Sequence, residues 1–231
     1  AYVYEYSSDN GATWQVFTAA TLFTAGTYNL RVTDGVGCIT LYADPVIITA
    51  PTEALNFTYT LSDYNGYNIS CYGGSNGKVE LKAKGGNGND YIGYAYAWDG
   101  GAFQTSALLE NINAGNHQLL VKDGRGCIVS KTVTFTQSSQ ALTIELASKK
   151  DVTCQYDRDG AITVKGIGGT GALRYALNGG APQDASLFTG LAEGSYTVSV
   201  IDANNCSHNL NVTIGTVHTP ITINTVAVSD I

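Results

Sequence analysis

Five cysteines are the side chains with the clearest chemical potential in this 231-residue sequence. In an exported protein paired thiols form disulfides, whereas an odd count normally signals a free thiol or an intermolecular bond. The spacing of the cysteines therefore has to be compared with the organisation of the chain before any pairing is assigned. The five are Cys38, Cys71, Cys127, Cys154 and Cys206.

Clustered carboxylates point to a second kind of chemistry, the binding of Ca²⁺ by oxygen ligands. Asp157 and Asp159 stand close together in the stretch DRDG. This stretch lacks the other ligands of an EF-hand loop, and an aspartate before a tight turn usually caps its own backbone. We therefore predict no metal and no cofactor, and calcium at Asp157 and Asp159 is the alternative.

Aromatic side chains beside loops could stack against sugar rings, which is a third kind of chemistry. Trp14, Tyr91 and Phe103 lie near expected turns and are the candidates for ligand contact. A regular ladder of aromatic residues at 94–98 is a weaker candidate. Its counterpart at 173–177 contains two leucines, so the ladder is predicted to be the inward stripe of a strand.

Catalytic chemistry has no support in the sequence. No HExxH, GxSxG or CxxC pattern occurs. The glycine-rich stretches GGNG (85–88) and GGTG (168–171) are each followed by a strand pattern, whereas a phosphate cradle needs a helix there. We predict that the protein is not an enzyme and that these glycines form turns.

Each of the late cysteines closes a stretch of sequence that occurs three times in the chain. AGTYNLRVTDGVGC (25–38) recurs as AGNHQLLVKDGRGC (114–127) and as EGSYTVSVIDANNC (193–206). In each copy a glycine precedes the cysteine by twelve residues. A self-similar period of this kind is typical of a repeat architecture.

An early cysteine marks the front of two copies. Cys71 stands six residues before Gly77, and Cys154 stands six residues before Gly160. An alternating pattern follows each glycine, KVELKAK in one copy and AITVKGI in the other. The first copy starts later in the pattern and lacks this part.

The repeat predicts the disulfides. Because the early and late cysteines occupy the same places in each copy, we predict the bonds Cys71–Cys127 and Cys154–Cys206. Cys38 then has its partner in sequence upstream of residue 1. A free or intermolecular Cys38 is the alternative.

Short strands must position these residues. Apolar and polar side chains alternate at 28–33 and at 196–200, which is the period-two pattern of a half-buried strand. The combination apolar-x-x-Gly-x-Tyr before a strand resembles the tyrosine corner of Greek-key sandwiches, in which the tyrosine hydroxyl ties back to the preceding loop. Tyr28 and Tyr196 hold the tyrosine position, and His117 takes it in the middle copy, where it would tie the corner differently.

About seven short strands per copy and frequent turn signals define the expected fold class. We predict an all-β protein of tandem immunoglobulin-like β-sandwich repeats arranged as an elongated rod. The net charge of −7, with only 12 Lys and Arg residues, argues against nucleic acid as a partner. No apolar run approaches the ~20 residues of a membrane helix.

The order of these features resembles the SprB repeat. C-x5-G, an alternating strand, GGxG, an aromatic strand with a D/N-G turn, apolar-x-x-G-x-Y, a second alternating strand and D-x-x-x-C follow one another through nearly the whole chain. SprB repeats occur in long surface adhesins of gliding bacteria and in related exported proteins. The resemblance implies export, cell-surface display and attachment to surfaces or polysaccharide. Departures are His117, Arg125 in the late turn, and an insertion before Cys71.

Four segments follow from this alignment. Residues 1–51 are a partial first repeat without its front strands, 52–138 the second repeat, 139–217 the third, and 218–231 the first strand of a following repeat. We expect the sequence to be a piece of a longer repeat array.

The expected function is that of a segment of a long extracellular repeat adhesin or surface filament, located at the cell surface. The expected partners are a surface polysaccharide or other surface ligand and neighbouring repeats of the same chain. Self-assembly into filaments by donation of the strand at 221–231 is a further expectation. One alternative is a carbohydrate-binding module of a secreted polysaccharide-degrading enzyme, and another is a purely structural spacer.

Overall fold

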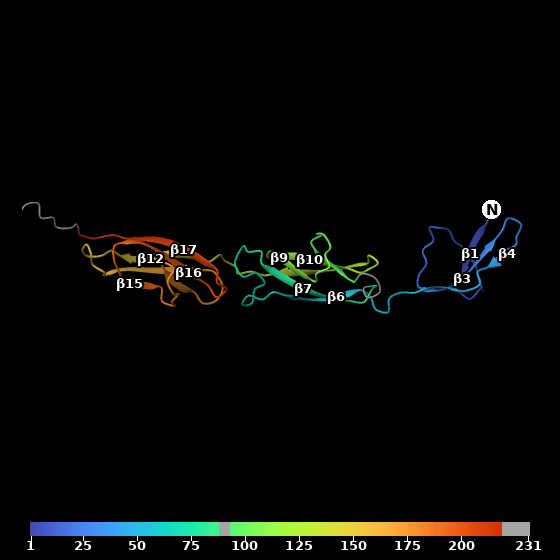
Figure 1. Cartoon of the computed structure of the whole chain (residues 1–231), viewed down its shortest axis with the longest axis horizontal. Helices are drawn as coiled ribbons and strands as arrows, with labels where there is room; N and C mark the ends of the chain where they lie inside the picture. Colours follow the sequence, from blue (N-terminus) through green and yellow to red (C-terminus); the bar gives the residue numbers. More distant parts are fainter. Residues whose placement is uncertain (88–92, 219–231) are drawn as a thin grey trace, which may run out of the picture.

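A computed structural model describes residues 1–87 and 93–218. These residues form an all-β protein of antiparallel strands, with no helix in the described ranges. Three units follow one another along the long axis of the molecule, coloured from blue through green to red in Figure 1. The second and third units have the immunoglobulin-like sandwich fold, and the first unit is described as one sheet of it.

The first unit contains a single sheet. Its strand order is β2-β1-β3-β4, and β5 pairs with the start of β3. The strands are β1 (Val3–Ser7), β2 (Gln15–Val16), β3 (Gly26–Thr33), β4 (Ile39–Leu41) and β5 (Val46–Ile48).

The second unit is a sandwich of two three-stranded sheets, β6-β7-β9 and β8-β10-β11. The described residues of this unit contain six strands, against the about seven that the sequence predicts, and an isolated bridge between Tyr96 and Gln104 extends the pairing. The six strands are β6 (Asn56–Leu61), β7 (Gly77–Lys84), β8 (Ala95–Trp98), β9 (Leu108–Ile112), β10 (Gly115–Lys122) and β11 (Ile128–Phe135).

The third unit repeats this arrangement with the sheets β12-β13-β15 and β14-β16-β17. The equivalent isolated bridge joins Tyr175 and Gln183. The six strands are β12 (Thr143–Lys150), β13 (Gly160–Ile167), β14 (Arg174–Leu177), β15 (Leu187–Leu191), β16 (Gly194–Ile201) and β17 (Ser207–Ile214).

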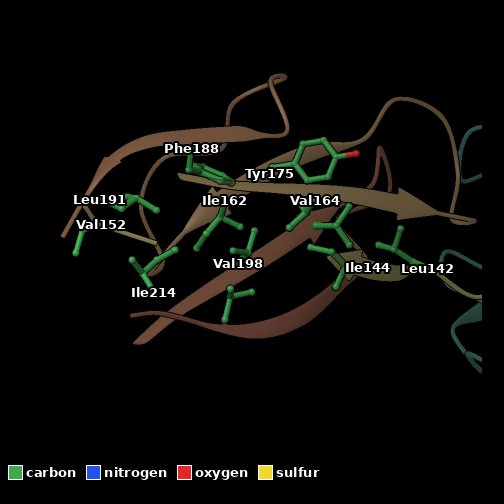
Figure 2. Close-up of a cluster of buried hydrophobic side chains, with 12 residues drawn as sticks. Leu142, Ile144, Val152, Ile162, Val164, Tyr175, Phe188, Leu191, Val198 and Ile214 are labelled. Carbon is green, nitrogen blue, oxygen red and sulfur yellow. The ribbon is translucent and has the colours of Figure 1, made fainter. Parts of the chain in front are cut away.

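Alternation along the strands builds the two cores. In β7 every second residue from Gly77 to Leu81 is buried, and β13 shows the same period. Figure 2 shows the core of the third unit, with Val152 and Leu191 at one end and Leu142 at the other. Tyr96 of the aromatic ladder and Tyr175 of its counterpart in the third unit are core residues.

The first unit exposes the face that is core in its neighbours. Tyr4 aligns with Tyr96, yet Tyr4 is 53% exposed whereas Tyr96 is 8% exposed. The reason is that the described first unit has one sheet and therefore no second apolar face to pack against it. Tyr4, Phe17 and Val32 line an open apolar hollow of about 270 Å³ on this face.

The tyrosine corners tie back to the preceding loop. The Tyr28 hydroxyl donates to the carbonyl of Thr24 (2.9 Å), and the Tyr196 hydroxyl donates to the carbonyl of Ala192 (3.0 Å). Both carbonyls lie four residues upstream of the tyrosine. The hydroxyl therefore fixes how the chain enters β3 and β16.

His117 ties the middle corner to the equivalent carbonyl and adds a carboxylate. Its Nε2 lies 3.0 Å from the carbonyl oxygen of Asn113, and its Nδ1 lies 2.7 Å from Asp99 Oδ2. Burial by itself raises the pKa of Asp99, but hydrogen bonds from the Gln118 backbone and from His117 outweigh it and lower that pKa. The imidazole is buried and so completes the core as well as the corner.

Removal of one corner hydroxyl tests its contribution. Tyr196→Phe should lower the free energy of unfolding of the third unit by about 0.5–1.5 kcal/mol, because one hydrogen bond is lost and the Ala192 carbonyl loses its donor. The measurement is thermal unfolding followed by circular dichroism. Tyr156→Phe, at a tyrosine that is 88% exposed in the same unit, is the control. Equal melting of both variants would contradict a stabilising corner.

Candidate functional site

A disulfide joins the second unit to the third. Cys71 and Cys206 are bonded, with their Cα atoms 5.7 Å apart. The predicted bonds Cys71–Cys127 and Cys154–Cys206 are therefore wrong. Cys127 and Cys154, as well as Cys38, are exposed and carry no disulfide.

The physical reason is that the early and late cysteines lie at opposite ends of a unit. Gly77, at the start of β7, pairs with Ile112, and β10 begins only three residues later at Gly115, so β7 and β10 start at the same end. The early cysteine precedes β7 and the late cysteine follows β10. Eight-residue strands span roughly 26 Å, whereas bonded cysteines need Cα atoms within about 7 Å.

The buried carboxylate of Asp202 positions the late cysteine. Its Oδ1 accepts hydrogen bonds from the backbone N–H groups of Asn204 and Cys206, both at 2.9 Å. Its Oδ2 accepts from the N–H of Thr170, also at 2.9 Å. Asp202 is 1% exposed, and these donors replace the water that a buried charge loses. The turn and the GGTG loop are thus held by one side chain.

The early cysteine of the joint, Cys71, lies in a loop that hydrogen bonds within the loop close. The N–H of Ser70 donates to Asn76 Oδ1 (3.1 Å), and the N–H of Gly74 donates to the Cys71 carbonyl (2.9 Å). Gln137, in the segment leaving the second unit, accepts from the N–H of Gly73 (2.7 Å). The loop therefore sits at the exit of the unit, next to the segment that leads to the third.

A polar contact accompanies the disulfide. The side-chain amide of Asn204 donates to the carbonyls of Ser70 (3.0 Å) and Tyr64 (3.2 Å) across the junction. The amide of Asn65 donates in return to Asn204 Oδ1. A covalent bond and several hydrogen bonds thus connect the same two loops, which we name the joint: residues 64–71 of the second unit and 203–206 of the third.

The connecting segment docks on the GGTG loop of the third unit. Ser138 Oγ donates to the carbonyl of Gly169 (2.8 Å), and the N–H of Gly169 donates to the carbonyl of Gln140 (3.2 Å). Gly168 has φ of +75°, and a Cβ there would lie 2.2 Å from the carbonyl oxygen of Ala141. Glycine is required because the connecting backbone approaches this closely.

The second unit uses the same device toward the first. The N–H of Gly86 donates to the carbonyl of Glu53 (2.8 Å), and a Cβ on Gly85 would lie 2.2 Å from the carbonyl oxygen of Ala54. The described glycines of GGNG and GGTG therefore form turns against which the connecting segment packs. They do not form a phosphate cradle.

Asp123 is the counterpart of Asp202 in the second unit. Its carboxylate accepts from the backbone N–H groups of Arg125 (3.0 Å), Cys127 (2.9 Å) and Asn87 (2.9 Å). Burial by itself raises the pKa of Asp123, but these hydrogen bonds outweigh it and lower the pKa from 3.8 to about 2. The Asp123 carboxylate therefore stays charged near neutral pH and keeps the turn that carries Cys127 closed.

The candidate ligand aromatics are not brought together. Trp14 belongs to the first unit, with the guanidinium of Arg31 4.3 Å from its ring centre, and Phe103 belongs to the second unit, with the Lys122 ammonium 4.3 Å from its ring centre. One ring face of each is thus already occupied. Tyr91 lies outside the described residues.

Asp157 and Asp159 close the loop that carries Cys154. Asp157 accepts from the N–H of Cys154 (2.9 Å), and Asp159 accepts from the N–H of Thr153 (3.0 Å). A hydrogen bond from Lys150 holds the pKa of Asp159 well below its usual range. Among residues 1–87 and 93–218, no group of three or more His, Cys, Asp and Glu side chains could hold a metal ion.

Sequence reasoning missed the polar half of the joint. Tyr64 and Asn65 lie in the insertion that makes the distance from Leu55 to Cys71 16 residues, against 12 from Leu142 to Cys154. The insertion was visible as a departure from the repeat. A length difference gives no contact partner, so its role at the junction could not be assigned from the sequence.

Thiol labelling tests the pairing directly. Unreduced, denatured chain treated with iodoacetamide should be labelled at three cysteines, the unbonded Cys38, Cys127 and Cys154, because the other two are protected. Prior reduction should give five labels. Cys206→Ser should expose Cys71 without prior reduction. Peptide mass spectrometry reads the result, and labelling of Cys38 alone would instead support bonds within each unit.

Acid should loosen the second unit through Asp123. The pKa of this carboxyl is about 2 in the folded chain and 3.8 unfolded, so its stabilisation is full above about pH 4 and is lost as the pH falls toward 2. Asp123→Asn should therefore destabilise the unit at pH 7 by about 1–3 kcal/mol, and the difference should shrink in acid. Urea unfolding read by Trp98 fluorescence measures it. Glu80→Gln, at an exposed carboxylate on β7, should show no such trend.

Comparison with solved structures finds several distantly similar chains. The eight N-terminal Ig domains of DSCAM match at 10% identity and TM-score 0.39, covering 93% of this chain and 32% of that one. Extracellular domains 3-5 of Drosophila OTK match at 12% identity and TM-score 0.31, covering 93% and 85%. Bacteroides ovatus SGBP-B, solved in complex with a mixed-linkage heptasaccharide, matches at 17% identity and TM-score 0.22, covering 93% and 60%. With scores this low, the likeness carries no information on function.

The sequence was also compared with curated proteins and with family models, and only the family models give a match. No curated protein matches the sequence. Within the described ranges, no helix is long and apolar enough to cross a bilayer. The SprB repeat family matches residues 67–103, which contain the loop of Cys71, and residues 146–182, which contain the loop of Cys154. The SprB repeat, the family that the sequence resembles, is therefore found at two places in this chain.

Proposed function

We propose that this chain is a segment of an extracellular repeat adhesin or surface filament, in which tandem sandwich units form a tether that carries attachment away from the cell. The observation that carries the proposal is the covalent joint between the second and third units, Cys71–Cys206. The two SprB repeat matches support the same assignment.

The disulfide determines which part of the chain can bear tension. A pull on the two ends passes from the first 71 residues through the sulfur atoms to residue 206, because the bond closes everything between them into a loop. The loop contains β7 to β16, which include most of both cores. Those strands can unfold without lengthening the tether, so the reach of the molecule is protected under load.

The joint also restrains the angle between the units. Asn204, Ser138 and the GGTG loop add hydrogen bonds on both sides of the disulfide. Separate restraints at different points of one junction oppose bending and twisting, whereas a single flexible linker would oppose neither. A stiff serial arrangement suits a tether that has to project from a surface.

The Cys71–Cys206 disulfide supports a location outside the cell. Structural disulfides form and persist in secreted and surface proteins and are rare in the cytosol of mesophiles. The proposed partner is a surface polysaccharide or another surface ligand, which many weak contacts along the array would hold by avidity. Gliding-type attachment is the particular role that the SprB resemblance implies.

Stretching single molecules tests the tether. With handles at residues 1 and 231, the oxidised chain should extend less than Cys71→Ser by roughly 450 Å of contour, because 135 residue steps stay inside the loop. A reductant should abolish the difference. Cys127→Ser, which leaves the joint intact, is the control and should match the wild type. Equal extension of oxidised chain and Cys71→Ser would contradict a tension-bearing joint.

Binding of the oxidised chain to an array of polysaccharides separates attachment from spacing. An adhesin segment should retain at least one surface polysaccharide in a multivalent format, for instance chain coupled to beads, and Trp14→Ala or Phe103→Ala should weaken retention. Retention of none would favour a purely structural spacer and would leave the tether measurement unaffected.

A further inference from the structure

The unpaired cysteines repeat the local geometry of the bonded ones. We propose that Cys154 and Cys38 are the two complementary halves of a joint like Cys71–Cys206, so that the early cysteine of one unit bonds to the late cysteine of the next. Cys127 is a late half of the same kind. The inference stands on the joint and does not depend on the tether function.

The late halves are closely alike. In the bonded turn the N–H of Cys206 donates to Asp202 Oδ1 at 2.9 Å. The N–H of Cys38 donates to Asp34 Oδ1 at 2.8 Å, and Cys127 makes the equivalent bond at 2.9 Å. An aspartate therefore holds each late cysteine in the same turn, whether or not the sulfur is bonded.

The early halves are also alike. In the bonded loop the residue before the cysteine donates to the side chain six positions on, Ser70 to Asn76. Thr153 donates in the same way to Asp159 Oδ1 at 3.0 Å. The cysteine carbonyl closes each loop by accepting an N–H three residues later, at 2.9 Å for Cys71 and 3.1 Å for Cys154.

Each early loop lies where the chain leaves its unit. The N–H of Asn68 donates to the carbonyl of Thr136 beside the exit of the second unit. Val152 pairs with Thr216, and the N–H of Val217 donates to the Val152 carbonyl beside the exit of the third. A unit that follows along the chain direction thus meets Cys154 as the third unit meets Cys71.

Exposed apolar side chains mark the two free halves. Val36, two residues before Cys38, is 86% exposed, and Tyr156, two residues after Cys154, is 88% exposed. In the Cys71–Cys206 joint, the residue equivalent to Val36 is Asn204, and its side-chain amide donates to the early loop across the junction. Contact between the free halves would cover apolar surface that each unit now presents to water.

Bond formation requires an oxidant, and a disulfide such as oxidised glutathione supplies it. The Cys154 thiolate attacks the oxidant and releases one glutathione thiolate, and the Cys38 thiolate then attacks the mixed disulfide and releases the second. Two protein thiols lose two electrons to the S–S bond of the oxidant. The two released thiolates take up the two protons.

The 231-residue chain provides its own probe, a second copy. Concentrated chain in a glutathione redox buffer should give a covalent head-to-tail dimer and longer ladders, seen on a non-reducing gel. Peptide mapping should find Cys154 bonded to a late cysteine of the other copy, chiefly Cys38. Cys154→Ser should abolish the ladder while keeping Cys71–Cys206, which shows that the variant is folded.

The identity of the bonded pairs decides the outcome. Cys38→Ser should remove most of the ladder, and Cys127→Ser should leave most of it. Bonds of Cys154 to itself, of Cys38 to itself, or between Cys38 and Cys127 would overturn the complementary pairing. A chain that stays monomeric with three free thiols at high concentration in oxidised glutathione would overturn it as well.

Discussion

The joint depends on one buried interaction, the carboxylate of Asp202 with backbone N–H groups. A charge that is 1% exposed at the end of a sandwich is tolerated only if donors replace its water, and Asn204, Cys206 and Thr170 provide them. Satisfying the charge fixes the turn, and the turn aims the cysteine at the preceding unit. The same carboxylate holds the glycine loop that receives the connecting segment, so both points of attachment are set together.

The first unit shows what happens when part of this system is absent. Asp34 holds the turn of Cys38 through one oxygen, at 2.8 Å, and the described first unit has no glycine loop for the other oxygen. Its single sheet leaves Tyr4 exposed on a face that is buried in the other two units. The turn is therefore a local structure that forms on its own sheet, whereas the core and the docking loop require the second sheet.

Local rules explain most of what could be predicted about the fold. Alternation predicts β7 and β13 because the side-chain period of a strand is fixed by the backbone, and the glycine three residues after an apolar position predicts the corner at Tyr196 because the hydroxyl reaches a carbonyl only four residues away. His117 shows the limit of this reasoning. Its bond to Asn113 follows from the corner, but its contact with Asp99 comes from the turn after β8, the strand that pairs with β10, and sequence distance does not reveal this pairing.

The sequence by itself determined the repeat, the strands and the position of every cysteine within its unit. It could not determine which cysteine meets which, because equivalent places in a repeat are compatible with bonds inside a unit and with bonds between units. Only the tertiary structure decided this: the strands that separate the two cysteine positions run from one end of the sandwich to the other. Cys71 therefore faces the next unit and Cys127 the previous one, and the end-to-end order of the units brings Cys71 to Cys206.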